Sequence, residues 1–335
     1  MFRKNVLQFV LESALEMPDQ PFFSVVIPVY NKEPHIARAI NSVLNQTFQE
    51  FEVVIVCDPS TDNSNAEVAK FTDLRIRKFH RYEPGPGGYA ARNLGIKEAR
   101  AEWVAFLDAD DEWYPEHLQN SKKIIAESAN ISFLAAGFEE IDKAVNVNRL
   151  KSSTKDYNTL SFEEYLAYSP FYTSSVVGKR ELLLSVNLFP EGKMKRGGDV
   201  DTWLRAIEKA GGYVLSAHIG AKYYRDSENM VTRQNFYTEA EIENRSIKDL
   251  IERYKETKLA RKLMVKFNNQ VIYAWNQNMH LGIKINFSLK GRLFFTVQPV
   301  KVGFYYMLSS MPMFILKPLH RLLFKAVSIK RKLVK

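Results

Sequence analysis

Phe23-Ser-Val-Val-Ile-Pro-Val29 and Phe51-Glu-Val-Val-Ile-Val-Cys57 decide the fold of this 335-residue chain. Both runs are almost continuously apolar and rich in β-branched residues, which is typical of strands buried on both faces of a parallel sheet. Further strands are expected at 73–79 and 103–107, and helical patterns separate the strands at 34–44, 62–70 and 88–99. This alternation predicts an α/β domain with a Rossmann-like, mostly parallel central sheet flanked by helices.

The next part of the chain continues the same mixture of elements. Strand patterns occur at 131–136, 171–177 and 221–225, and helical patterns at 116–128, 179–186 and 200–209. We expect these elements to complete the domain begun by the first two strands. From about Thr238 the pattern becomes helical and then strongly basic.

Polar side chains follow three of the predicted strands at the point where each strand ends. They are Tyr30 and Asn31 after the first strand, Asp58 after the second, and Asp108-Ala109-Asp110-Asp111 after the fourth. In open parallel sheets, ligands bind at the carboxyl ends of the strands. These residues are therefore the first candidates for a ligand site.

The carboxylates of Asp108, Asp110 and Asp111 gather at one strand end, which is electrostatically costly unless a cation lies among them. Oxygen ligands of this kind suit Mg²⁺ or Mn²⁺, which also take substrate phosphates as ligands. The alternative is a helix cap, because Pro115 follows shortly after and proline favours the first turn of a helix. Both roles are compatible with the sequence.

Two glycine-containing segments offer further candidates. Gly85-Pro86-Gly87-Gly88-Tyr89-Ala90 matches a dinucleotide fingerprint, but it follows the third candidate strand and not the first. It can still bring backbone close to a phosphate, with Arg92 in the helix that follows. Asp199, after Gly197 and Gly198, could complement a helix dipole or act as a general base.

Taken together, these segments resemble the family 2 glycosyltransferases of the GT-A fold. The resemblance spans about residues 22–230. It is carried by Ser24-Val-Val-Ile-Pro-Val-Tyr-Asn31, Gln46-Thr-Phe48, Asp58-Pro-Ser-Thr-Asp62, Ala91-Arg-Asn93 with Gly95, Phe106-Leu-Asp-Ala-Asp-Asp111, and Gly198-Asp199 with Trp203-Leu-Arg205. It implies a nucleotide-binding half over 22–115 and an acceptor half over 116–230.

The resemblance also implies roles for individual residues. Asp108 would contact ribose, Asp110 a metal-bound diphosphate, and Asp199 would be the catalytic base of an inverting reaction. The implied nucleotide-binding residues are Pro28, Tyr30, Asn31, Asp58, Gly87, Arg92 and Asp108, and the donor- or acceptor-side candidates are Asp111, Gly198, Trp203 and Arg205. The donor would be a UDP-sugar by the habit of the family, with Mn²⁺ or Mg²⁺, and the acceptor a glycan or lipid-linked oligosaccharide of a bacterial cell surface.

Three positions depart from the family pattern. Cys57 replaces a frequent Asp, Pro59 replaces Gly, and Gly198 stands where Glu is common. The departures at Pro59 and Gly198 leave open a non-catalytic protein that binds a glycan or scaffolds an assembly on a degenerate transferase fold. The glycine loop near residue 85 leaves open a nucleotide-dependent oxidoreductase.

The two ends of the chain differ from its body. Residues 1–21 have apolar residues at helical spacing interrupted by Glu12 and Glu16, so an amphipathic helix is expected there and not a secretory signal. Cys57 is the only cysteine, which excludes an internal disulfide and fits a reducing compartment such as the cytoplasm.

The C-terminal region, 231–335, is predicted to be a helical extension. After Glu256 the chain has no Asp or Glu, and its last 79 residues carry 15 Lys or Arg, although the net charge of the whole chain is only +9. Val302–Leu316 lacks charge, but its 15 residues are too few to span a bilayer. We expect the region to lie peripherally on an anionic membrane, at the inner face of the cytoplasmic membrane. The alternative is a helical lid with a solvated basic face; no nucleic-acid partner is expected.

Overall fold

The computed structural model describes residues 20–128, 130–142, 147–148, 155–225, 227, 236–243, 245–280, 289 and 291–333. The helix expected over 1–21 lies almost wholly outside these residues. The chain divides into two compact units. The first comprises Met1–Gly192 and Gly198–Asn229, and the second comprises Lys193–Gly197 and Met230–Lys335.

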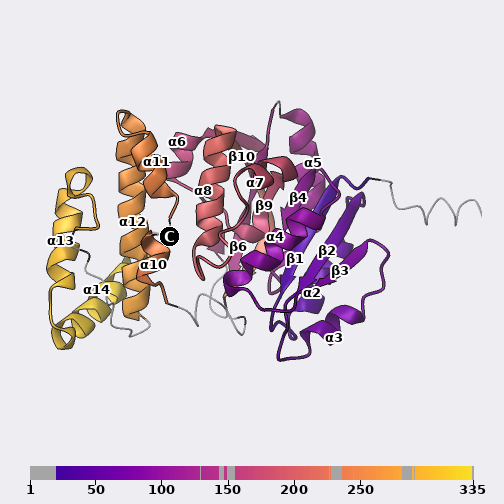
Figure 1. The fold of residues 1–335 in the computed structure, drawn as a ribbon, viewed down its shortest axis with the longest axis horizontal. Coiled ribbons are helices and arrows are strands. Elements are labelled where there is room, and N and C mark those ends of the chain that lie inside the picture. The colour runs from indigo at the N-terminus through magenta and orange to yellow at the C-terminus, as the bar shows by residue number, and fades with distance from the viewer. Residues whose placement is uncertain are drawn as a thin grey trace, which may run out of the picture. The chain divides into compact units, whose positions relative to one another are not determined.

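The first unit is built from the strands and helices that the sequence pattern indicates, with several additions (Figure 1). Its strands are β1 (Phe23–Val29), β2 (Phe51–Cys57), β3 (Ile76–His80), β4 (Trp103–Phe106), β5 (Glu112–Trp113), β6 (Phe133–Ile141), β7 (Val147–Asn148), β8 (Tyr157–Ser161), β9 (Val176–Lys179) and β10 (Gly212–Tyr224). Its helices are α2 (Ile36–Leu44), α3 (Ser64–Ala69), α4 (Tyr89–Glu98), α5 (His117–Glu127), α6 (Phe162–Ala167), α7 (Arg180–Ser185) and α8 (Gly198–Ala210), with 3₁₀ turns η1 (Pro86–Gly88) and η2 (Thr173–Ser175).

The described strands form one sheet in the order β3-β2-β1-β4-β9-β6-β10-β5, with β7 beside β6 and β8 beside β10. The half predicted to bind a nucleotide, β3-β2-β1-β4, is parallel throughout, as predicted. In the other half β9 runs antiparallel to both β4 and β6, whereas β6 and β10 are parallel. The carboxyl ends of β1, β2 and β4 therefore lie together at one edge.

Alternate residues of β1 point to opposite faces of the sheet, because successive side chains of a strand alternate in direction. Val25 and Ile27 belong to a buried cluster that contains the apolar face of α2. Val26 points the other way, toward α4, where a Cβ at Gly95 would come within 2.4 Å of its side chain. Glycine at position 95 thus allows α4 to pack directly on the sheet.

Several elements differ from the prediction. The strand expected over 171–177 begins only at Val176, because Thr173–Ser175 form a 3₁₀ turn. β10 extends from Gly212, nine residues before the expected start, and it pairs with β6, β8 and β5. These pairings use polar residues such as Ser216, whose alternation with apolar residues is too weak to mark a strand in the sequence.

The second unit is helical where it is described. Its helices are α10 (Glu239–Glu243), α11 (Ile247–Arg253), α12 (Lys258–His280), α13 (Pro299–Ser309) and α14 (Met313–Leu333), with a 3₁₀ turn η3 (Phe295–Val297). Trp275 and Asn276 of α12 hold the last two helices: the Trp275 ring contacts Tyr305 and His320, and Asn276 Nδ2 donates to Tyr305 Oη at 3.0 Å. Within the described part of the chain, no helix is long and apolar enough to cross a membrane.

Candidate active site

The acidic turn after β4 is the centre of the site. Asp111 is buried, and its Oδ2 accepts hydrogen bonds from Ser174 Oγ at 2.6 Å and from Tyr172 Oη at 2.9 Å. The backbone N–H of Asp108 donates to the same Ser174 Oγ at 3.0 Å. Burial, with the negative charges of Asp110 and Asp108, raises the pKa of Asp111 well above its ordinary value. Asp111 therefore fixes the turn, while the other two carboxylates are left for ligands.

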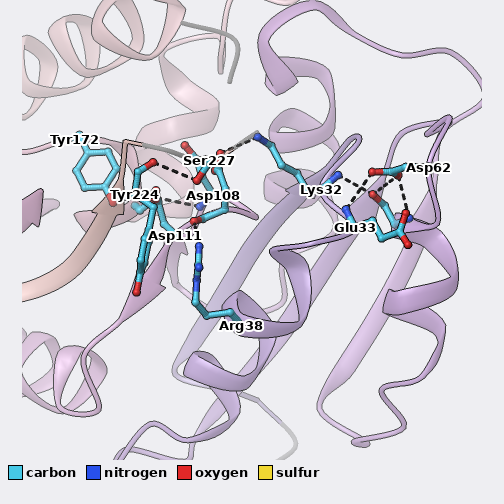
Figure 2. A network of polar contacts seen from close by, with 12 residues as sticks. Lys32, Glu33, Arg38, Asp62, Asp108, Asp111, Tyr172, Tyr224 and Ser227 are labelled. Carbon is cyan, nitrogen blue, oxygen red and sulfur yellow. Dashed lines mark hydrogen bonds and ion pairs between the residues drawn. The ribbon is translucent and has the colours of Figure 1, made fainter. Parts of the chain in front are cut away.

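Two cationic side chains contact these two carboxylates. Arg92 of α4 pairs with Asp108 Oδ1 and also donates to the Gly87 carbonyl at 3.0 Å. Lys32 Nζ lies 2.7 Å from Asp110 Oδ2, with both side chains mostly buried. Figure 2 shows Lys32 between the acidic turn and the contact of Glu33 with Asp62. Each carboxylate of the Asp-x-Asp pair thus has its own cation.

The loop after β1 has an unusual backbone that directs Lys32. Asn31 has φ of +52°, a left-handed conformation that few residues other than glycine adopt. Its N–H donates to Ser60 Oγ at 3.1 Å, and its Oδ1 accepts from the Thr61 N–H at 2.8 Å. The Lys32 N–H donates to Ser64 Oγ at 2.7 Å. The loops after β1 and β2 are therefore tied together beside the acidic turn.

Asp58 lies at the same edge of the sheet, next to the glycine loop. It is buried at the end of β2, where Arg81 Nη1 lies 2.6 Å from its Oδ1 and the Gly85 N–H lies 3.3 Å from its Oδ2. Burial raises the pKa of Asp58, and the Gly85 N–H and Arg81 oppose the rise. Through Asp58, the glycine loop is attached to the sheet edge; Gly87 in that loop has a left-handed φ of +70°.

Asp199 lies in the first turn of α8. Its Oδ2 accepts a hydrogen bond from Thr173 Oγ1 at 3.3 Å. The negative charge of Asp199 contributes to raising the pKa of Asp108 and of Arg92, so the three side chains lie close together. Thr173 belongs to the same 3₁₀ turn as Ser174, which holds the acidic turn. The structure thus brings Asp199 to the group formed by Asp108 and Arg92.

The structure gives a physical reason for Gly198, where the family pattern has Glu. Its N–H donates to Tyr89 Oη at 2.9 Å, and a Cβ at this position would lie 2.7 Å from Tyr89 Cζ and 2.8 Å from Pro190 Cγ. The Tyr89 ring, which stacks on Phe189, occupies the space that a side chain at position 198 needs.

Not every candidate lies at the site. Trp203 is buried in an aromatic cluster with Phe106, Phe133 and Phe189. Arg205 pairs with Asp201 and donates to the carbonyls of Val186 and Leu188. Both residues support α8 from within the fold. Pro28 lies at the end of β1, where its Cβ would be 3.8 Å from a Cβ on Gly88, and Tyr30 is exposed beside it.

Sequence reasoning missed several residues of the site. Lys32 directly follows Asn31 in the chain, but only the left-handed turn makes it face Asp110. Arg38 of α2 donates to the Asp110 carbonyl at 2.5 Å and lies over the Tyr224 ring at 3.7 Å. The sequence pattern predicts a strand over Tyr172 and Ser174, and no motif signals that they bind Asp111.

The donor set fits a divalent cation that arrives with a diphosphate. Among the described residues, no group of three or more His, Cys, Asp or Glu side chains is placed to hold a metal ion. Within the described residues, the side-chain contact of Asp110 is made through Oδ2, to Lys32, which leaves Oδ1 for a ligand. Mg²⁺ commonly binds one or two carboxylates, with waters and substrate phosphates completing its shell. Asp110 suits such a partial site and not a closed protein cage.

Comparisons with known proteins identify the family. The model of Glycosyl transferase family 2 matches residues 24–183. The amylovoran biosynthesis glycosyltransferase AmsB of Erwinia amylovora is 31% identical over 223 residues, which cover 63% of this chain and 70% of AmsB. The chain belongs to glycosyl transferase family 2. The resemblance seen in the sequence is thereby confirmed, and an oxidoreductase built on the glycine loop, which follows β3, has no support.

Other relatives share a smaller part of their length. An uncharacterized glycosyltransferase of Rickettsia felis is 36% identical over 189 residues, 56% of this chain and 30% of that protein. The UDP-Glc:alpha-D-GlcNAc-diphosphoundecaprenol beta-1,3-glucosyltransferase WfgD of Escherichia coli is 35% identical over 144 residues, 42% of this chain and 56% of WfgD. The chain thus spans less than a third of the first of these proteins and just over half of the second.

The fold matches a solved transferase structure. S. aureus TarS 1–349 in complex with UDP-GlcNAc superposes with a TM-score of 0.61 at 22% identity, covering 89% of this chain and 86% of that one. The GT-A class expected from the sequence is therefore confirmed, together with a helical C-terminal region.

Proposed function

We propose that this chain transfers a sugar from a UDP-sugar to a hydroxyl group of a glycan or lipid-linked glycan, with inversion at the anomeric carbon. The observation that carries the proposal is the meeting of Asp108, Asp110 and Asp199 at one sheet edge, where Arg92 and Lys32 supply positive charge. WfgD is named for a UDP-glucose donor and a lipid diphosphate acceptor, and TarS was solved with UDP-GlcNAc. Both names support the choice of donor, and that of WfgD also supports the class of acceptor.

In the proposed reaction, Asp199 acts as the base. Its carboxylate takes the proton of the acceptor hydroxyl while the hydroxyl oxygen bonds to the anomeric carbon. The bond from that carbon to the diphosphate oxygen breaks, and its electron pair stays on the departing UDP. A single displacement from the opposite face inverts the configuration. Asp199 lies in the first turn of the 13-residue helix α8.

The leaving diphosphate needs positive charge as the bond breaks. Arg92 and Lys32 are held at the two aspartates and can donate to phosphate oxygens. Asp110 would hold Mn²⁺ or Mg²⁺, and when bound the ion neutralises charge growing on the diphosphate. Asp58, Asn31 and Tyr30 line the side of the edge proposed for the nucleoside.

The same proposal assigns a location. The strongly basic C-terminal region would place the enzyme peripherally on an anionic membrane surface, at the inner face of the cytoplasmic membrane, where a lipid-linked acceptor is presented. This fits the polysaccharide synthesis for which AmsB is named.

Thermal stabilisation by ligands tests the donor site. Wild type and Asp110→Asn are melted with UDP, GDP, dTDP or NAD, each with and without Mn²⁺. Ligand at 100 times its Kd adds about 2.7 kcal/mol of stability. We expect a shift by UDP that is enhanced by Mn²⁺ in the wild type only. Stabilisation by NAD alone, or by no nucleotide, would contradict the proposal.

A further inference from the structure

The outer surface of α13 is apolar where a helix facing water is normally polar. Val300, Phe304 and Met307 recur at the spacing of one helical face and are all exposed, Val300 to 86%. The opposite face contains Val302, which is buried, and Tyr305, which contacts Trp275 of α12. An exposed apolar face on a helix that already packs through its other face indicates a surface that binds a partner or a membrane.

The outer surface of α14 repeats this pattern and adds charge. Phe314, Pro318 and Leu322 follow one another at intervals of four residues, with Phe314 78% and Leu322 66% exposed. Leu316 and His320 are buried on the opposite side. Lys317 and Arg321, both exposed, each precede a member of the apolar row.

The two exposed faces point away from the same part of α12. Tyr305 of α13 and His320 of α14 both contact Trp275, and both form a polar contact with Asn276. The packed sides of the two helices therefore meet at one place on α12, and their apolar sides face outward. Figure 1 shows the two helices in yellow, as consecutive members of the helical unit.

We infer that the outward faces of α13 and α14 form an anchor that inserts into the headgroup region of a bilayer rich in anionic lipids. The anchor comprises Val300, Phe304, Met307, Phe314 and Leu322, with Lys317 and Arg321 at its border. The inference rests on the membrane location proposed above and names the surface that carries it.

Charge complementarity selects this occupant. The chain has no acidic residue after Glu256, while its last 79 residues include 15 Lys or Arg. A second copy docking through the same face would bring two strongly positive surfaces together, which is unfavourable. A nucleic acid would satisfy the positive charges but would leave Val300, Leu322 and Met307 facing phosphates. An anionic bilayer satisfies both kinds of side chain, because acyl chains take the apolar groups and headgroups take the bases.

We expect the anchor to insert only shallowly into the bilayer. In the described part of the chain no helix is suited to span a bilayer, and α13 has 11 residues. Amphipathic helices that do not span a bilayer lie in the plane of the membrane–water interface. Their apolar side chains reach the boundary between headgroups and acyl chains. Binding should therefore be reversible and sensitive to ionic strength, because each Lys or Arg near an anionic surface contributes about 1 kcal/mol.

Vesicle sedimentation with the full chain tests the anchor. Vesicles of phosphatidylcholine alone are compared with vesicles that also contain phosphatidylglycerol. We expect binding to the anionic vesicles to fall by about 10-fold or more in Phe314→Ser/Leu322→Ser. In Lys317→Gln/Arg321→Gln the expected loss is roughly 30-fold, for two charges. Because all four side chains are exposed, the variants should melt like the wild type.

Matched controls use other exposed residues of the first unit. Leu74, which is 65% exposed, matches Leu322, and Lys70 matches the basic positions. Leu74→Ser and Lys70→Gln should bind vesicles like the wild type. Equal loss in these controls, or no preference for anionic vesicles, would overturn the inference. So would a dimer in sedimentation velocity that disappears in Phe314→Ser/Leu322→Ser, because the face would then belong to a second copy.

The anchor and the proposed transferase reaction can be tested independently of each other. Turnover of UDP-sugar on a water-soluble acceptor is measured for the same variants without vesicles. It should remain within about twofold of the wild type, since none of the changed residues belongs to the proposed site. Vesicle binding without turnover in the wild type would reject the transferase proposal and leave the anchor standing. Turnover without vesicle binding would reject the anchor alone.

Discussion

Lys32 Nζ lies 2.7 Å from Oδ2 of Asp110, so the carboxylate proposed to hold the metal is paired with a protein cation when no donor is bound. A lysine ammonium and a divalent cation compete for the negative charge of the same carboxylate. When donor and metal arrive together, Lys32 can transfer its hydrogen bonds to the diphosphate. The pair thus links metal binding to donor binding.

Replacing Lys32 by Gln should therefore have opposite effects on the two ligands. The affinity for Mn²⁺ alone should rise several-fold, because Asp110 loses its competitor. The affinity for UDP without metal should fall roughly 10-fold, because a charge-assisted hydrogen bond is lost. Manganese EPR and calorimetric titration measure the two constants. Lys70→Gln serves as the control, and parallel changes of both affinities would contradict the role given to Lys32.

The departure at position 198 leads to a prediction on stability. Gly198→Ala places a Cβ against the Tyr89 ring and Pro190 and should cost about 1–3 kcal/mol of unfolding free energy. In a Tyr89→Ala background the same change should cost at least about 1 kcal/mol less, because one of the two neighbours is gone. Urea denaturation of the four proteins gives the coupling. Simple additivity would show that Tyr89 does not fill this space.

The buried side chain of His117 should contribute to the pH dependence of the stability of the fold. The ring is buried against Trp113, and burial lowers its pKa from 6.5 to about 3. Between these values the unfolded chain binds the proton and the folded chain does not, so stability falls as the pH decreases through this window. The contribution is at most about 1.4 kcal/mol per pH unit.

His117→Asn should remove this part of the acid slope. Urea unfolding between pH 4 and 7 should show a shallower loss of stability in the variant, whatever its stability at neutral pH. Identical slopes in the two proteins would mean that His117 has the same pKa in the folded and unfolded states.

The sequence predicted the parallel half of the sheet well, and for a physical reason. β1 and β2 are buried on both faces, so nearly every residue in them is apolar and the signal is strong. Positions after β2 and β4 then identified Asp58, Asp108 and Asp110. β5 has only two residues, and the paired segments of β8 and β10 mix apolar residues with Gly, Ser, Thr and Asn, so their existence depends on neighbours that sequence patterns do not show.

The site was less predictable where it depends on backbone conformation. Lys32 reaches Asp110 because Asn31 adopts a positive φ, and that conformation is held by Ser60 and Thr61 from another loop. Ser174 reaches Asp111 because its segment forms a 3₁₀ turn in place of the predicted strand. Trp203 and Arg205 were included because they belong to a motif, although they support α8 from inside the fold.

The role of Asp199 as base is the central claim, and Asp199→Asn tests it most directly. Turnover of UDP-sugar with acceptor is measured beside the Kd of UDP with Mn²⁺, and Asp201→Asn, an acid of the same helical turn that pairs with Arg205, is the matched control. If Asp199 is the base, we expect a loss of turnover on the order of 10²–10⁴-fold in Asp199→Asn with the Kd nearly unchanged, and a much smaller loss in the control. Full turnover in Asp199→Asn, or equal losses in both variants, would contradict it.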